Sequence, residues 1–213
     1  MSRIYTIGVV VFDGVLCSEV IGPAEVFAIA GQHEDFGGAQ VVIVGVEQQP
    51  VIRTAEGIRI GVDATIADAP TLDVLIIPGG NDMSHLQRNQ ELRAFIQKQE
   101  QAGQWLGSVC AGAFLLGAAG VLDGKHATTW HGGERRLQEQ FPAIHVVHDQ
   151  PVVLDHRTLT ANGGLVSYRA ALVLLGQLSS SRHALEVYTS LGIERLGTWD
   201  DIAATITMAH MAM

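Results

Sequence analysis

Short runs of apolar residues, each followed by a segment with helical periodicity, constrain the fold of this chain more than any other feature. Apolar or small residues occupy successive positions, not alternate ones, in the runs at residues 4–12, 41–46, 74–77, 105–109 and 158–161. Strands of this kind are buried on both faces, as in a parallel sheet covered by helices. Helical patterns lie between or after them, at residues 20–30, 91–101, 111–119 and 165–178. The alternation predicts an α/β fold, a three-layer sandwich with a central, mostly parallel sheet and helices on both faces.

The remaining segments add smaller elements to this sandwich. A hairpin is expected at residues 51–62, around Glu56 and Gly57, and a helix at residues 133–140. Short strands are expected near residues 126–129, 145–147 and 152–154, and further helices at residues 182–190 and 199–211. No linker, repeat or low-complexity segment interrupts the pattern. Residues 1–213 are therefore predicted to form one domain, with a core at residues 4–178 and a helical extension at residues 182–213.

Composition and charge exclude several classes of protein. Hydrophobic residues make up 47% of the chain and charged residues 16%, which is incompatible with a disordered chain. The chain has 13 basic against 22 acidic residues, a net charge of −9 and no basic run, so no nucleic-acid partner is expected. Residues 101–122 carry no charge and are long enough to span a bilayer. Their glycines and polar residues divide this segment into a strand-like and a helix-like piece, so we predict buried core and no membrane partner.

The cysteines indicate a reducing environment. The chain has two cysteines, Cys17 and Cys110, and no secretory signal pattern precedes them. This usage predicts a cytoplasmic protein in which a cysteine more often carries chemistry than a disulfide. Cys17 is interpreted as structural. The nine histidines are scattered, and His145 and His148 would lie on opposite faces of a strand. We therefore predict no metal and no cofactor.

The loop after residue 109 has the features of a nucleophile elbow. In parallel α/β sheets, ligands bind at the carboxyl ends of strands, so the loops after residues 12, 77 and 109 are the expected site. Cys110 lies between an apolar strand and a small-residue helix, with Ser108 and Gly112 two residues to either side. An elbow strains the backbone and presents the sulfur at a helix N-terminus, where free amides favour the thiolate. The alternative is a buried cysteine that packs as a small hydrophobic residue.

Candidates for supporting roles follow the other two strands. Gly79 and Gly80 end a buried strand, and their amides could donate to developing negative charge, although an ordinary tight turn has the same pattern. Glu19 follows the first strand and is either a helix cap or a carboxyl that hydrogen-bonds the Cys110 sulfur and shuttles a proton. We expect the strands preceding Cys110 and Glu19 to be neighbours in the sheet. Because two facing anions repel each other, these two groups should share one proton.

Taken together, these segments resemble the ThiJ/PfpI superfamily, which has a flavodoxin-like fold related to class I glutamine amidotransferases. The resemblance extends over about residues 4–178 and depends on the strings at residues 9–14, 19–27, 73–80, 108–112, 122–129 and 159–164. It implies that Cys110 is the nucleophile and Glu19 the facing acid. It also implies that the Gly79 and Gly80 amides help to form an anion pocket.

Within the superfamily, the string at residues 19–27 is similar to isonitrile hydratases and to the amidase-like sensor domain of AraC-type regulators. Ala111 occupies the position at which the protease-like branch has a histidine, which argues against a peptidase. Trp130 occupies the position at which glyoxalase and deglycase-like relatives have a histidine, with His131 one residue further on. We place both Trp130 and His131 in the substrate pocket. The acid of the hydratase branch is usually aspartate, and Glu19 is one methylene longer.

The leading expectation is a cysteine-dependent hydro-lyase or hydrolase that acts on a small molecule, such as an isonitrile converted to an N-substituted formamide. Amides of Gly79 and Ala111 would stabilise the developing charge. A non-catalytic ligand-binding or redox-sensing domain is the alternative, and a glyoxalase or deglycase-like activity is less favoured. Because relatives are commonly homodimers, a homodimer is expected.

Overall fold

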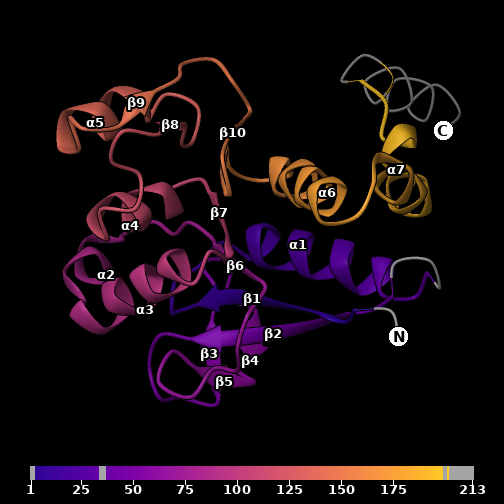
Figure 1. Cartoon of the computed structure of the whole chain (residues 1–213), viewed down its shortest axis with the longest axis horizontal. Helices are drawn as coiled ribbons and strands as arrows, with labels where there is room; N and C mark the ends of the chain where they lie inside the picture. Colours follow the sequence, from indigo (N-terminus) through magenta and orange to yellow (C-terminus); the bar gives the residue numbers. More distant parts are fainter. Residues whose placement is uncertain (1–2, 34–36, 199–200, 202–213) are drawn as a thin grey trace, which may run out of the picture.

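Seven strands form the central sheet of the computed structural model, which describes residues 3–33, 37–198 and 201 (Figure 1). Their order across the sheet is β10-β11-β7-β6-β1-β2-β5. The strands are β1 (Tyr5–Val11), β2 (Ala39–Gly45), β5 (Ala64–Thr65), β6 (Val74–Ile77), β7 (Trp105–Val109), β10 (Val152–Asp155) and β11 (Thr158–Ala161). All neighbours pair in parallel except β10 and β11, which form an antiparallel hairpin. The predicted mostly parallel sheet is confirmed.

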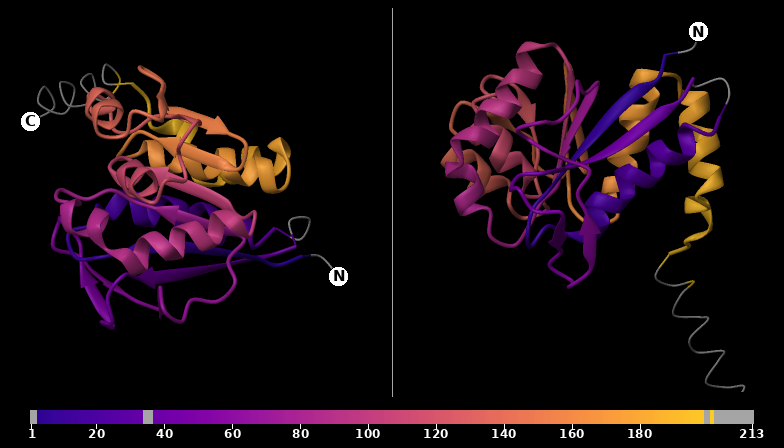
Figure 2. Two further views of the ribbon diagram at one scale, coloured as in Figure 1. Left: turned by 60° about the vertical axis from the view of Figure 1, so that its left-hand side comes forward. Right: turned by 90° about the horizontal axis from the view of Figure 1, so that it is seen from below.

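Helices cover both faces of this sheet (Figure 2). The helices α1 (Cys17–Ala30), α6 (Val166–Leu178) and α7 (Ser181–Ser190) pack on one another over one face. The helices α2 (Ser84–Arg88), α3 (Gln90–Gln101) and α4 (Gly112–Ala118) lie over the other face. The predicted three-layer sandwich is therefore also confirmed.

Burial explains why apolar runs without alternation form these strands. Every residue of β6 and of β11 is buried, and so is β1 from Ile7 onward. A strand with helices on both faces has no solvent side, so successive side chains all pack in the interior. The buried apolar side chains form one continuous hydrophobic cluster.

Most of the predicted elements are present, and the missed ones are short. The hairpin of β3 (Val51–Arg53) and β4 (Arg59–Gly61) is antiparallel, as expected. The elements β5, α2 and the 3-10 helix at Ile193–Arg195 were not predicted from the sequence. These segments of two to five residues are too short to show a period. The predicted helix at residues 199–211 falls, apart from residue 201, outside the described residues.

The uncharged segment at residues 101–122 divides into a strand and a helix, as predicted. It includes the strand β7 and the helix α4, and both are largely buried. No helix in the described part of the chain is long and apolar enough to cross a membrane.

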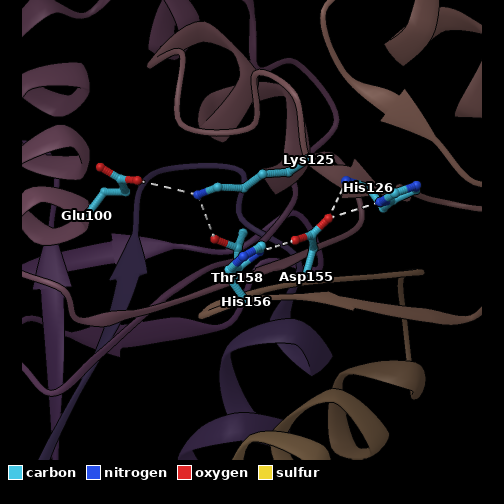
Figure 3. Close-up of polar contacts among 6 residues, drawn as sticks. All are labelled: Glu100, Lys125, His126, Asp155, His156 and Thr158. Carbon is cyan, nitrogen blue, oxygen red and sulfur yellow. Dashed lines mark hydrogen bonds and ion pairs between the residues drawn. The ribbon is translucent and has the colours of Figure 1, made fainter.

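A small unit lies beside the main sheet, formed by β8 (His126–Ala127), α5 (Glu134–Gln140) and β9 (His145–Val146). Asp155 connects it to the sheet, because its Oδ2 accepts a hydrogen bond from the backbone N–H of His126 at 2.8 Å (Figure 3). The same carboxylate contacts Nδ1 of His126 at 3.0 Å and Nδ1 of His156 at 2.5 Å. Lys125 Nζ lies 3.4 Å from Glu100 and 3.2 Å from Thr158 Oγ1. This polar cluster lies at the beginning of β11. The predicted site lies at the other end of the same strand.

Candidate active site

Cys110 occupies a strained turn between β7 and α4. Its φ is +55°, in the left-handed region that side chains other than glycine rarely adopt. Two hydrogen bonds hold the turn: its N–H donates to the Ala161 carbonyl at 2.9 Å, and its carbonyl accepts from Thr129 Oγ1 at 2.7 Å. The predicted elbow geometry is therefore present. The conformation is held by the neighbouring strand β11 and by the loop that follows β8.

Glu19 lies in the first turn of α1 and is completely buried, with 0% of its surface exposed. Its Oε2 accepts a hydrogen bond from the Gly79 N–H at 2.7 Å, and its Oε1 accepts one from the Gly164 N–H at 2.9 Å. The carboxyl group also hydrogen-bonds the side chain of Cys110. Its orientation is therefore set by two backbone donors from separate loops, and it faces the sulfur.

The strands that precede Cys110 and Glu19 are not neighbours, which corrects the expectation from the sequence. Strand β6 lies between β7 and β1 and pairs with both. Glu19 nevertheless reaches the sulfur because the loop after β6 carries no side chain at Gly79. A Cβ atom at this position would lie 2.8 Å from the Cβ of Cys110 and 3.0 Å from Oε2 of Glu19. Glycine is required here by this close approach.

A second glycine closes the pair from the other side. A Cβ at Gly163 would lie 2.7 Å from Oε1 of Glu19 and 3.0 Å from the Cys110 sulfur. Gly163 and Gly164 were not predicted as site residues, although both follow the buried strand β11. Ligands bind at the carboxyl ends of parallel strands, and the loop after β11 is the fourth such loop, so this rule predicts both glycines as site residues. Asn162 in the same loop hydrogen-bonds the Thr129 carbonyl through its side-chain amide.

Burial dominates the titration of this pair. It raises the pKa of Glu19, against smaller opposing effects of the Gly164 and Gly79 amides and the Cys110 hydrogen bond. Burial, followed by the negative charge of Glu19, raises the pKa of Cys110 to about 12, although the Ala111 N–H acts in the opposite direction. The helix N-terminus alone predicted a favoured thiolate, and the burial of the thiol outweighs it. A thiolate at Cys110 is therefore favourable only when Glu19 carries the proton.

A cavity of about 260 Å³ opens onto the sulfur. It is lined by Leu16, Gly80, Asn81, Asp82, Met83, Ser84, Gln87, Cys110, Ala111, Phe114, Trp130 and Arg136. Trp130 stacks on Phe114, with ring centres 5.1 Å apart and planes at 25°. This gives the cavity a flat aromatic wall.

The structure distributes the other predicted site residues unevenly. Gly80, Ala111 and Trp130 line the cavity, whereas His131 is exposed and lies outside its lining. The Gly79 N–H donates to Glu19, so the structure assigns this amide to the acid and not to the cavity. Arg136, which the sequence analysis did not single out, lines the cavity from α5. Among the described residues, no group of three or more histidine, cysteine or acidic side chains is arranged to hold a metal ion.

Fold and site together define a cysteine elbow on a flavodoxin-like α/β sandwich, and comparison with known proteins gives the family. The chain belongs to the DJ-1/PfpI family, whose model matches residues 5–175. An isonitrile hydratase from Pseudomonas putida is 33% identical over 172 residues, which cover 81% of this chain and 71% of the relative. The solved structure of DJ-1beta from Drosophila melanogaster superposes with a TM-score of 0.79 at 24% identity, covering 90% of this chain and 98% of that one.

A transcription regulator is also similar. The HTH-type transcriptional regulator GbdR of Pseudomonas aeruginosa is 29% identical over 123 residues, 58% of this chain. The match covers 33% of the regulator, so most of that protein has no counterpart here.

Proposed function

We propose that this protein is a cysteine-dependent hydro-lyase that adds water to a small isonitrile and releases an N-substituted formamide. The observation that carries the proposal is the pair of the partly buried Cys110 and the fully buried Glu19 at a cavity of about 260 Å³. The similarity to an isonitrile hydratase over 81% of the chain supports this choice of substrate.

In the proposed reaction, the pair supplies the nucleophile and the acid. The Cys110 sulfur forms a bond to the terminal carbon of R–NC, while the shared proton is transferred through Glu19 to that carbon, giving the thioimidate R–N=CH–S–Cys110. Water then adds to the same carbon, with its proton taken up by Glu19. Glu19 passes this proton to the nitrogen, the C–S bond breaks as the hydroxyl proton returns to the Cys110–Glu19 pair, and R–NH–CHO leaves with the single shared proton restored. The Ala111 N–H, which donates to the sulfur, is placed to follow the developing charge.

A ligand-binding domain without turnover is the second candidate. The pKa of Cys110, raised to about 12 by burial and the Glu19 charge, favours a protonated thiol in the resting state. A protonated thiol is a poor nucleophile and a poor target for oxidants. The similarity to a transcription regulator points in the same direction.

Hydration of cyclohexyl isonitrile, followed as formamide by chromatography, separates the two candidates. We expect turnover by the wild-type protein and by Cys17→Ser, the matched control, because Cys17 is absent from the cavity lining. Cys110→Ser should lose turnover by at least about a thousandfold, because no strong base activates a serine hydroxyl there. Turnover of methylglyoxal in place of the isonitrile, or equal rates in wild type and Cys110→Ser, would contradict the proposal.

A further inference from the structure

Arg136 is the residue with a permanent positive charge in the lining of the Cys110 cavity. Its guanidinium carbon lies 5.6 Å from the centre of the Phe114 ring, which in turn stacks on Trp130. The contact of a guanidinium with an aromatic face is attractive and leaves its N–H donors, which lie at the edge of its plane, available. The cavity therefore combines the Cys110 sulfur, an aromatic wall and a cation that lies beside that wall.

The charge of Arg136 is not neutralised within the described part of the chain, where it makes no ion pair. The neighbouring Arg135 provides a contrast, because its Nε lies 3.7 Å from Glu139 one helical turn away. Four residues from Arg136 lie Gly132 and Gln140, which offer no carboxylate, and Glu139, three residues on, forms its ion pair with Arg135. The Gln140 side chain instead donates to Gln87 at 2.5 Å.

The acidic residue in the same lining, Asp82, forms its hydrogen bond with Ser84 and not with Arg136. Asp82 Oδ1 accepts a hydrogen bond from the Ser84 N–H at 2.9 Å, at the beginning of α2. This hydrogen bond holds the pKa of Asp82 below its usual value, so Asp82 stays ionised. Within the residues that the structure describes, it forms no ion pair with Arg136. The cavity thus has an unpaired cation and an acid committed to a helix terminus.

We propose that Arg136 determines specificity by binding a carboxylate on the substrate, whose reacting carbon lies at Cys110 and whose body lies along the Phe114–Trp130 wall. Its planar fork of donors matches a carboxylate in a bidentate arrangement. The identity of the reacting group rests on the function proposed above. The preference for an anionic ligand does not, because it follows from the cavity and from the unpaired charge of Arg136 in its lining.

Alkylation of Cys110 by iodoacetate and by iodoacetamide tests the preference independently of turnover. The two reagents bring the same carbon to the sulfur and differ in carrying a carboxylate or an amide. Rates are read by mass spectrometry on the peptide that contains Cys110, which separates it from Cys17. We expect the ratio of the iodoacetate rate to the iodoacetamide rate to fall about threefold to tenfold in Arg136→Gln.

Two variants and one condition distinguish charge recognition from a structural role. Arg136→Lys should restore part of the ratio, since it keeps the charge without the fork. Arg135→Gln, the adjacent arginine outside the cavity lining, should leave the ratio unchanged. Added salt should lower the wild-type ratio towards that of Arg136→Gln, because salt screens exposed charges. Equal slowing of both reagents in Arg136→Gln, or the same ratio in all variants, would overturn the proposal.

Two further measurements cover the remaining outcomes. If Cys110 reacts with neither reagent, calorimetric titration with benzoate and benzamide decides: tighter benzoate binding that is lost in Arg136→Gln supports the proposal, and equal binding overturns it. With isocyanoacetate and its neutral methyl ester as substrates, Arg136→Gln should lower kcat/KM for the acid alone, by on the order of tenfold. Failure of the wild type to hydrate either compound would reject the proposed function, and the alkylation ratio would still decide the role of Arg136.

Discussion

At the scale of single residues, Glu19 holds the site together as well as serving it. Its two carboxyl oxygens accept from two backbone donors, Gly79 and Gly164, and the group also bonds the Cys110 side chain. A carboxyl satisfies all of these at once, because it offers acceptors on both oxygens and one proton to share with the sulfur. A side-chain amide does not, since one of its ends is a donor only.

The first prediction follows from this mismatch. Glu19→Gln should lower the free energy of unfolding by about 1–3 kcal/mol, because its NH₂ group would face a backbone N–H and leave a buried donor unsatisfied. Urea denaturation at neutral pH measures the change. Glu47→Gln is the matched control, because Glu47 is exposed and its substitution should have little effect. Equal stability of the two variants would show that Glu19 is not held by these donors.

The second prediction concerns the proton shared by Cys110 and Glu19. Because burial and the facing carboxylate raise the pKa of Cys110 to about 12, its alkylation by iodoacetamide should keep accelerating from pH 7 to pH 10. In Glu19→Gln the facing charge is gone, so the pKa of Cys110 should fall and its rate at pH 9 should rise severalfold. Peptide mass spectrometry reads Cys17 in the same samples as an internal reference. A plateau below pH 9 in the wild type would contradict this account.

At the scale of secondary-structure elements, the sequence predicts the buried strands best. The bounds of β6, β7 and β11 were predicted to the residue, because Pro78 follows β6, Asn162 follows β11, and β7 lies between the polar Gln104 and the elbow at Cys110. The position of β6 between β1 and β7 was not predicted, since strand order is decided by packing between distant segments. The same limit applies to the site. Cys110 and Glu19 were found from local patterns, whereas the contact of Arg136 with the cavity depends on where α5 docks.

The third prediction concerns the connection between β8 and β10. Asp155 accepts from the backbone and ring of His126 and from the His156 ring (Figure 3), and these hydrogen bonds hold its pKa below the usual range. The stabilisation that comes from a lowered pKa is fully present above the unfolded-state pKa of about 3.9. It is lost as the pH falls towards the folded-state pKa. Asp155→Asn should therefore cost about 1–2 kcal/mol of stability at pH 6, and the difference should shrink below about pH 4.

Urea unfolding of wild type and Asp155→Asn at pH 6, 5, 4 and 3.5 measures this difference. Asp123→Asn is the control, because Asp123 is exposed on a turn and should change stability little at any of these values. A difference that is the same at pH 6 and pH 3.5, or absent at both, would show that the charge of Asp155 does not contribute.

At the scale of the whole molecule, the chemistry and the polar connections lie at opposite ends of the same strands. The carboxyl end of β7 leads to Cys110, and those of β6 and β11 lead to Gly79 and Gly163, which lie on either side of the Cys110–Glu19 pair. The opposite end of β11 begins at the Asp155 cluster, which fixes the small unit that carries α5. Since Arg136 enters the cavity from α5, the position of this unit decides what the cavity can bind.

The last prediction is that the chain forms a homodimer in solution. On the face covered by α1, α6 and α7, large apolar side chains remain exposed: Ile21 at 42%, Leu165 at 67% and Leu185 at 62%. A second subunit that packs on these three helices would cover these side chains. Sedimentation equilibrium at micromolar concentration should give twice the chain mass of 22.8 kDa. Leu165→Glu should shift the protein towards monomer, whereas Ile58→Glu, which changes an exposed apolar residue of the β3–β4 hairpin region, should not. A monomeric wild-type protein would contradict the predicted dimer. A dimer that Leu165→Glu leaves intact and Ile58→Glu dissociates would show that the subunits contact each other through another surface.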